Sequence, residues 1–158
     1  MKRALFLAIP LVLASGSAFA GQATGGGALA LAALVGDQSP QLTADQKIVL
    51  SRFLNGETNF TVPAGAKNFI VAAIKVQCRA SNVAITFHAC EVSFGPKMAT
   101  PSGRAAHELY ATLAEIGVQP NGAAGTTYMS VNGLSCTIDA TEIQSNDGGG
   151  ASCTYSTN

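Results

Sequence analysis

Residues 69–78, with the sequence FIVAAIKVQC, decide the fold of this chain because they predict a largely buried β-strand. The even-numbered positions of this stretch are all apolar and end at Cys78, whereas the odd-numbered positions change from apolar to polar at Lys75 and Gln77. A strand with this pattern begins buried on both faces of a sheet and ends with one face exposed. We therefore expect a fold that is built on a β-sheet.

The next strand is predicted over residues 83–94, after a turn at residues 79–82. Its apolar residues occupy odd positions up to Phe87 and even positions from Cys90 onward, so their phase shifts by one residue near His88 and Ala89. One extra residue that moves the inward face to the other side is typical of a β-bulge. We expect such a bulge at His88–Ala89.

Three further strands are predicted toward the C-terminus, over residues 126–131, 134–139 and 151–155. The first two flank Asn132-Gly133, a dipeptide that favours a two-residue hairpin turn. This hairpin would place Met129 opposite Cys136.

Two helices are predicted, over residues 44–54 and about 102–116. Thr43 and Gln46 have the spacing of a capping box, and Asn55-Gly56 ends the first helix. The fold class is therefore α+β, with two helices packed on an antiparallel sheet. Each helix precedes strands that carry two cysteines, which suggests a duplicated αβββ unit with halves over 43–95 and 96–158. The alternative is that this common order of elements occurs twice by chance.

The N-terminus has the features of a secretory signal peptide over residues 1–20. Lys2 and Arg3 form a basic region, an apolar run follows, and Ala18-Phe19-Ala20 is a cleavage site before Gly21. Residues 21–42 are expected to be a glycine- and alanine-rich leader that precedes a single domain over 43–158. The apolar run 28–35 within that leader is either a short buried helix or an exposed tail.

All four cysteines lie after the signal peptide, in a compartment where disulfides persist. Three pairings are possible, and we expect Cys78–Cys90 and Cys136–Cys153 because the members of each pair lie on consecutive strands. The cysteines are too widely spaced for a zinc site of the C-x₂₋₄-C type. A periplasmic or secreted location follows from the signal peptide and the cysteines together.

The charge of the chain argues against two classes of partner. Loss of Lys2 and Arg3 leaves seven basic against nine acidic residues. Binding to nucleic acid or to an acidic membrane surface needs clustered Lys and Arg, so we expect no nucleic-acid partner. No stable membrane anchor is expected after cleavage, since the apolar run 28–35 is too short to span a bilayer.

No catalytic, metal or cofactor motif is recognisable. The two histidines are His88, at the expected bulge, and His107, which precedes Glu108. The H-E-x-x-H zinc pattern fails because Ala111 stands where the second histidine would be. We therefore expect no catalytic residue, no metal and no cofactor, and interpret His88 as structural, with a lesser role as a candidate binding residue.

The expected function is that of an exported binding protein whose partner is another exported protein. Loops on a rigid scaffold are the natural binding elements, so residues 95–102, with Lys97 and Met98, and residues 121–127 are the candidates. Two halves with one disulfide each are similar in plan to small secreted bacterial inhibitors such as tandem-repeat β-lactamase inhibitors, which implies enzyme inhibition as one form of binding. A structural or adhesive surface component is the alternative, and a small hydrolase with an unrecognised site is the third. The oligomeric state is left open.

Overall fold

The computed structural model describes residues 19–81, 87–122, 125–146 and 149–157, and all element bounds refer to these ranges. The strands are Phe19–Thr24 (β1), Asn68–Ser81 (β2), His88–Phe94 (β3), Lys97–Ala99 (β4), Thr126–Asp139 (β5) and Ala151–Thr157 (β6). The α-helices are Gly25–Gln38 (α1), Ala44–Leu54 (α2), Gly103–Glu115 (α3) and Ala140–Asn146 (α4), and Ala64–Ala66 form a 3-10 turn.

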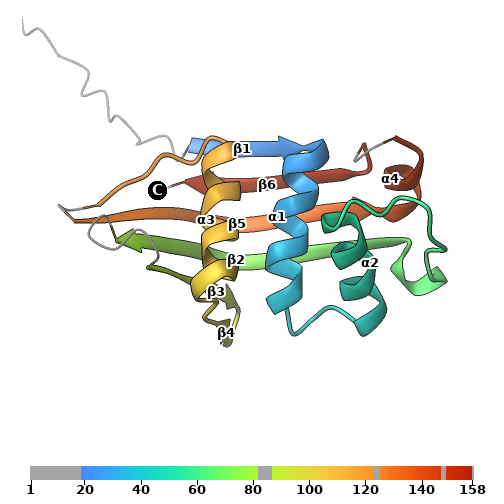
Figure 1. Cartoon of the computed structure of the whole chain (residues 1–158), viewed down its shortest axis with the longest axis horizontal. Helices are drawn as coiled ribbons and strands as arrows, with labels where there is room; N and C mark the ends of the chain where they lie inside the picture. The colour runs from blue at the N-terminus through green and yellow to red at the C-terminus, as the bar shows by residue number, and fades with distance from the viewer. Residues whose placement is uncertain (1–18, 82–86, 123–124, 147–148, 158) are drawn as a thin grey trace, which may run out of the picture.

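The strands form one antiparallel sheet in the order β1-β6-β5-β2-β3-β4. Helices α1 and α3 lie side by side across one face of the sheet, with α2 next to α1 (Figure 1). The expected α+β class is confirmed, with four helices in the described ranges rather than the two that were expected. In the described part of the chain the opposite face of the sheet carries no helix, and we term it the helix-free face.

The order of elements repeats along the chain. The first half runs β1-α1-β2-β3 and the second runs β4-α3-β5-β6, with α2 and α4 added. β2 and β5 pair at the centre of the sheet, while β1 lies beside β6 and β4 beside β3, so each edge strand joins the other half. The repeated unit is therefore β-α-β-β and begins at β1, which differs from the expected αβββ halves over 43–95 and 96–158. α1, and not α2, is the counterpart of α3.

In the two central strands, β2 and β5, the alternation of buried and exposed side chains shifts by one residue, and the shifts occur at paired positions. The buried side chains of β2 shift between Ala73 and Val76, and those of β5 shift between Val131 and Leu134. These residues pair as Ala73↔Leu134 and Val76↔Val131, so the buried side chains of both strands stay on the helix side along their full length. As a result, Ile70 is 60% exposed on the helix-free face, although the sequence pattern groups it with the buried Cys78.

Residues 21–42 are part of the fold, which corrects the expectation of a separate leader. β1 pairs with β6, and α1 contributes Leu31 and Val35 to the core with no exposed surface. α1 lies between the sheet, α2 and α3, and a helix that is enclosed on several sides needs no polar face. Of the two alternatives for residues 28–35, the buried helix is therefore correct.

The helix that was expected over 44–54 begins and ends as its sequence predicts. The Thr43 hydroxyl accepts from Gln46 N at 3.3 Å, and the Gln46 side chain accepts from Thr43 N at 2.9 Å, which completes the capping box. Gly56 then adopts a φ of 79° after the last turn. The second expected helix is also present, as α3.

The prediction of a hairpin at Asn132-Gly133 is wrong, because both residues lie inside the continuous strand β5. Gly133 has a φ of 57°, and the pairing of β5 with β6 shifts between Asn132 and Ser135. A glycine in the left-handed region that opens a register shift is typical of a β-bulge. Met129 consequently pairs with Cys78 on β2 and does not lie opposite Cys136.

The bulge that was expected at His88–Ala89 is not found in the described strand. β2 and β3 pair without interruption from Ala80↔His88 to Lys75↔Ser93. The earlier part of the expected strand, residues 83–86, lies outside the described residues.

Both expected disulfides are confirmed. Cys78–Cys90 joins β2 to β3 with a Cα–Cα distance of 4.0 Å, and Cys136–Cys153 joins β5 to β6 at 3.9 Å. The members of each pair lie directly opposite one another across two antiparallel strands. All four cysteines are buried, so the disulfides lie within the core between the sheet and the helices.

Candidate functional site

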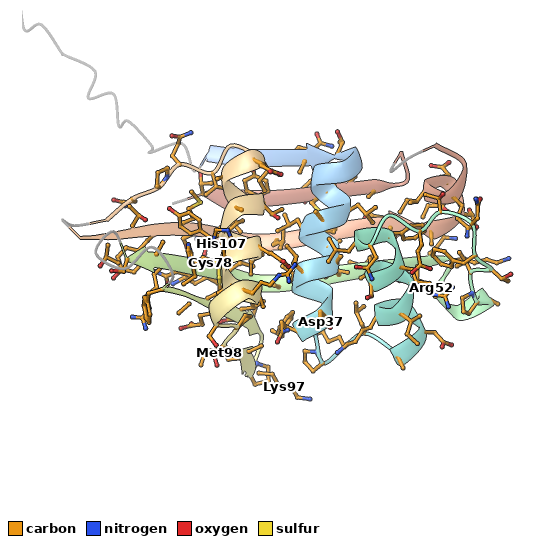
Figure 2. The ribbon with its side chains drawn as sticks, in the orientation of Figure 1. Asp37, Arg52, Cys78, Lys97, Met98 and His107 are labelled. Atoms are coloured by element: carbon orange, nitrogen blue, oxygen red, sulfur yellow. A yellow bond between two sulfur atoms is a disulfide. The ribbon has the colours of Figure 1, made fainter. Side chains whose placement is uncertain are left out.

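The three candidate binding residues from the sequence do not form one site. Lys97 and Met98 lie on the edge strand β4, where Met98 is 59% exposed and Lys97 points away from the molecule (Figure 2). His88 begins β3, whereas Phe94, the partner of Lys97, ends it. Six residues of strand span roughly 20 Å, so His88 and Lys97 lie at opposite ends of β3.

His88 instead lies against the other histidine of the chain, His107 on α3. His107 Nδ1 is 3.3 Å from His88 Nε2, and the two ring centroids are 4.5 Å apart in an edge-to-face arrangement. The Tyr110 ring contacts His88 from the same helix, and the Tyr110 hydroxyl forms a 2.9 Å hydrogen bond with the Thr127 hydroxyl. No sequence pattern indicates this pairing, because it depends on how α3 packs on β3.

The electrostatics of the pair favour a neutral ring at His88. Desolvation lowers the pKa of His88 below its ordinary value, and the nearby charge of His107 lowers it further. A neutral imidazole has one nitrogen that can accept a hydrogen bond or bind a metal ion.

A second group of residues lies at one end of the helix-free face, and we term Gln77, Arg79, Phe87, Glu91 and Tyr128 the Tyr128 surface. Arg79 pairs with Tyr128 across β2 and β5, and Gln77 pairs with Glu91 across β2 and β3. The Arg79 guanidinium lies 5.6 Å from the centre of the Phe87 ring, and Phe87 is 49% exposed. The surface thus combines two aromatic rings, both signs of charge and an amide.

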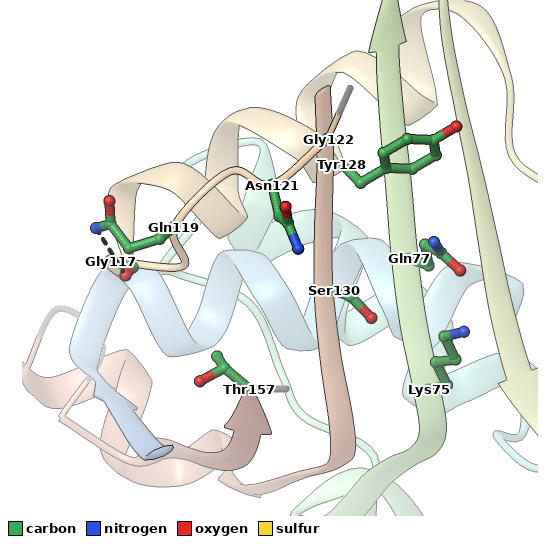
Figure 3. Close-up of a pocket in the computed structure, with 9 residues that line it drawn as sticks. All are labelled: Lys75, Gln77, Gly117, Gln119, Asn121, Gly122, Tyr128, Ser130 and Thr157. Atoms are coloured by element: carbon green, nitrogen blue, oxygen red, sulfur yellow. Dashed lines mark hydrogen bonds between the residues drawn. The ribbon is translucent and has the colours of Figure 1, made fainter. Parts of the chain in front are cut away.

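A cavity of about 670 Å³ adjoins this surface (Figure 3). Its lining includes a lysine, three amides and three hydroxyls, together with two glycines: Lys75, Gln77, Gly117, Gln119, Asn121, Gly122, Tyr128, Ser130 and Thr157. Asn121 N donates to Tyr128 O at 2.7 Å, which attaches the segment after α3 to the start of β5. Part of the candidate loop 121–127 therefore forms one wall of the cavity, while residues 123–124 lie outside the described ranges.

A second hollow of about 580 Å³ lies on the other side of Gln77 and Tyr128, which line both cavities. Arg79, Glu91 and the segment Thr100–Ser102 form its remaining polar walls. Because Gln77 and Tyr128 line both, the two hollows are adjacent, and we term the polar side chains that line them the polar band.

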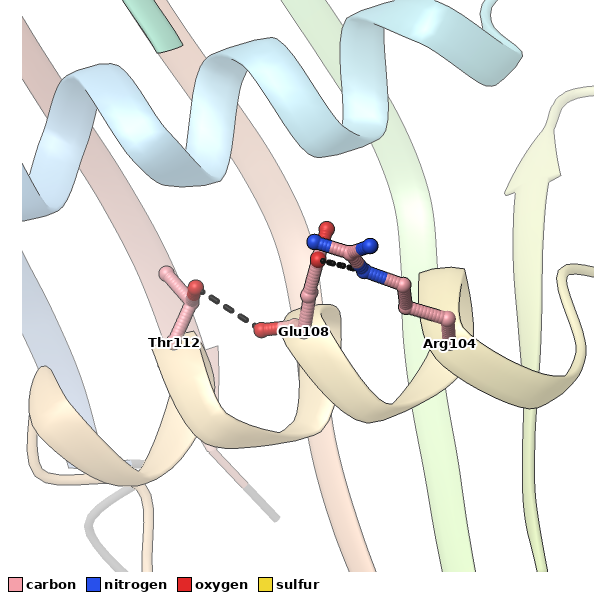
Figure 4. A network of polar contacts seen from close by, with 3 residues as sticks. All are labelled: Arg104, Glu108 and Thr112. Atoms are coloured by element: carbon pink, nitrogen blue, oxygen red, sulfur yellow. Dashed lines mark hydrogen bonds and ion pairs between the residues drawn. The ribbon is translucent and has the colours of Figure 1, made fainter. Parts of the chain in front are cut away.

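The polar contacts on α3 are structural. The Arg104 guanidinium donates to Glu108 at 2.8 Å, one helical turn away, and the Thr112 hydroxyl donates to Glu108 O at 2.9 Å (Figure 4). Exposed pairs at this spacing stabilise a helix by only a few tenths of a kcal/mol. No reactive side chain takes part in this network.

Two kinds of feature are absent from the described residues. No cluster of three or more His, Cys, Asp and Glu side chains has a geometry that could hold a metal ion. No helix in the described ranges has the length and apolar character needed to cross a bilayer.

Sequence reasoning missed Arg79, Phe87 and Tyr128. Arg79 falls in the predicted turn 79–82, but in the structure it lies inside β2. Phe87 and Tyr128 have the apolar and alternating character of strand residues, which gives no indication of the face they occupy. Only the register of the sheet brings the three together.

Comparison of the chain with protein-family models, with curated proteins and with solved structures finds no match. The functional proposals therefore rest on the residues and their geometry.

Proposed function

We propose that this protein is an exported binding protein that contacts another exported protein through the Tyr128 surface. The observation that carries the proposal is the cluster of Arg79, Phe87 and Tyr128 on the helix-free face, beside two adjacent hollows. Tyr, Phe and Arg are enriched at protein interfaces, and Tyr and Arg are frequent among the residues that dominate binding energy.

The shape of the polar band favours a macromolecular partner over a small ligand. A small ligand binds best in a single pocket that encloses most of its surface. Here Gln77 and Tyr128 form a ridge between two hollows whose walls are rich in amides, hydroxyls and charges. An extended loop of a partner protein could cover both hollows and contact the ridge between them.

Export is the second element of the proposal, and it rests on the signal peptide over residues 1–20. The two disulfides are compatible with it, because such bonds persist in oxidising compartments. Inhibition of an enzyme is a narrower form of the same proposal, in which the partner's active-site region occupies the polar band.

A structural or adhesive role is the second candidate. The structural observation that favours it differs from the sequence feature that first suggested it. The apolar run 28–35 no longer supports it, because α1 is buried. Ile70 and Ile74, which are 60% and 59% exposed, supply an apolar patch that could mediate self-association. Concentration-dependent association that is lost in an Ile70→Ser/Ile74→Ser variant would favour this candidate.

The test begins with affinity purification of the tagged mature protein from its native envelope, read by mass spectrometry. The captured partner is then purified and titrated with the wild type and with Arg79→Ala/Tyr128→Ala. A loss of about 2 kcal/mol or more, equivalent to about 30-fold in Kd, is expected if these residues anchor the complex.

Two further double variants locate the binding surface. Ile48→Ala/Ser51→Ala changes exposed residues of α2 on the helix side and is expected to bind as the wild type does. Lys97→Ala/Met98→Ala tests the edge strand β4 as a separate or additional contact. Full binding by the Arg79/Tyr128 variant together with loss in the Lys97/Met98 variant would move the site to β4 and refute the Tyr128 surface.

A further inference from the structure

The chain has two histidines, and the fold places them in contact although they are 19 positions apart. His88 begins β3 and His107 lies in the second turn of α3, so the pair spans the junction between the sheet and a helix. Both rings lie on the helix side of the sheet, apart from the Tyr128 surface on the opposite face.

The separation of the two nitrogens matches the distance between two ligands of a tetrahedral metal ion. His107 Nδ1 and His88 Nε2 are 3.3 Å apart. Two Zn–N bonds of about 2.05 Å that span this distance make an angle of about 107° at the metal, close to the tetrahedral value. Small ring rotations direct both lone pairs to one point, and the exposure of His107 leaves room for them.

The backbone around both histidines is held in place by independent contacts. The Cys78–Cys90 disulfide anchors β3 two residues from His88, and Cys90 Sγ lies 3.5 Å from the carbonyl oxygen of Ala106, the neighbour of His107. Cys90 N also donates to Pro101 O at 2.9 Å, just before α3. Tyr110, fixed by Thr127, packs against the His88 ring. Such support reduces the entropy lost when two ligands bind one ion.

We propose that His88 and His107 form a two-imidazole binding site for a divalent transition-metal ion of the zinc type. Imidazole nitrogen is a preferred ligand of zinc, copper and nickel. The bite angle favours tetrahedral Zn²⁺ over the smaller cis angle of square-planar Cu²⁺. Among the described residues no third His, Cys, Asp or Glu joins the pair, so the remaining positions are open to water or to a donor from a partner protein.

The neutral state of His88 is consistent with this role. A histidine must be deprotonated at the ligating nitrogen to bind a metal, and burial already lowers the pKa of His88. The Nδ1···Nε2 contact then serves as the metal-free form of the site, in which one ring donates to the other.

The test is isothermal titration of ZnCl₂ into the full mature chain with both disulfides formed, at neutral pH in a buffer that does not chelate zinc. One saturable site per chain is expected, and His88→Ala and His107→Ala should each weaken it at least tenfold. Glu115→Gln, an exposed change at the C-terminal end of α3, is the matched control and should bind zinc as the wild type does. Thermal unfolding of each variant without metal establishes that it folds.

A spectroscopic measurement keeps the proposal testable if a histidine variant does not fold. Imidazole ¹H–¹⁵N correlation spectra of the wild type should show both rings shift together as ZnCl₂ is added, and at no more than one equivalent. Several weak sites, binding that persists in both histidine variants, or a wild-type spectrum in which neither ring responds would overturn the proposal.

Discussion

The ring of Tyr155 on β6 lies across Gly21, its partner on β1, and the Tyr155 hydroxyl donates to Ile116 O at 3.0 Å. A Cβ at Gly21 would overlap this ring, so the close approach requires glycine there. The Tyr155 side chain thus packs against the edge strand β1 and also forms a hydrogen bond at the end of α3. Burial also raises the pKa of Tyr155, which keeps its hydroxyl protonated as a donor.

Tyr155→Phe should lower the free energy of unfolding by about 1 kcal/mol, because the Ile116 carbonyl loses its donor while the ring stays in place. Urea unfolding followed by circular dichroism measures this difference. Tyr128→Phe is the matched control, since that ring is half-exposed on the helix-free face, and its effect should stay within about 0.5 kcal/mol. Equal stabilities of the Tyr155 variant and the wild type would mean that this hydrogen bond contributes nothing.

Gly133→Val should destabilise the protein by about 1–3 kcal/mol, because a β-branched residue is strained at the φ of 57° found there. Gly133→Asn should lose much less, since asparagine tolerates the left-handed region. Thermal unfolding measures the stability of both variants. A larger loss for valine than for asparagine is due to backbone strain, because both variants lack the glycine. If valine and asparagine cost the same, the bulge conformation assigned to β5 is wrong.

Local patterns predicted the parts of the fold that depend on local physics. The cap at Thr43 and Gln46 is completed within one helical turn, so its residues alone define it. The cysteine pairing followed from two antiparallel neighbours whose cysteines alternate inward, as at Cys78 and Cys90. The predicted hairpin at Asn132-Gly133 and the bulge found there both use a positive φ at Gly133, and only the pairing of β5 with β6 distinguishes them.

The remaining features depend on tertiary packing that a single sequence does not specify. Helix α1 is rich in glycine and alanine, like a flexible leader, because it is enclosed by its neighbours. At Gly36, for example, a Cβ would lie 2.7 Å from Leu50 of α2, so the close packing of the two helices requires glycine. The residue patterns of β1 and β4 give no indication that each of these strands pairs with a strand of the other half. The same holds for the candidate site, since His88 and His107 meet only when α3 packs on β3.

Removal of either disulfide, by Cys78→Ser/Cys90→Ser or by Cys136→Ser/Cys153→Ser, should lower the free energy of unfolding by roughly 3 kcal/mol on the chain-entropy model. The loops they close are similar, with sequence separations of 12 and 17, so the two losses should agree within about 1 kcal/mol. Chemical denaturation of the two double variants measures both. A loss confined to one variant would mean that the other disulfide adds no constraint beyond the packed strands.

The stability of the protein should fall as the pH is lowered from about 7.5 to about 5, and His88 should account for part of that slope. Its pKa in the folded protein is below the value of about 6.5 that an exposed histidine has, so the unfolded chain binds the proton more tightly. The stabilisation is therefore complete above that value and is lost as the pH falls toward the folded pKa. His107 and the Tyr110 ring face His88 from α3, and the charge of His107 opposes protonation of His88 in the folded protein. Melting temperatures at half-unit pH intervals test this, with His88→Gln as the variant that removes the titrating group. The variant should show a shallower decline than the wild type over this range, and parallel declines would show that His88 has the same pKa in the folded and unfolded chains.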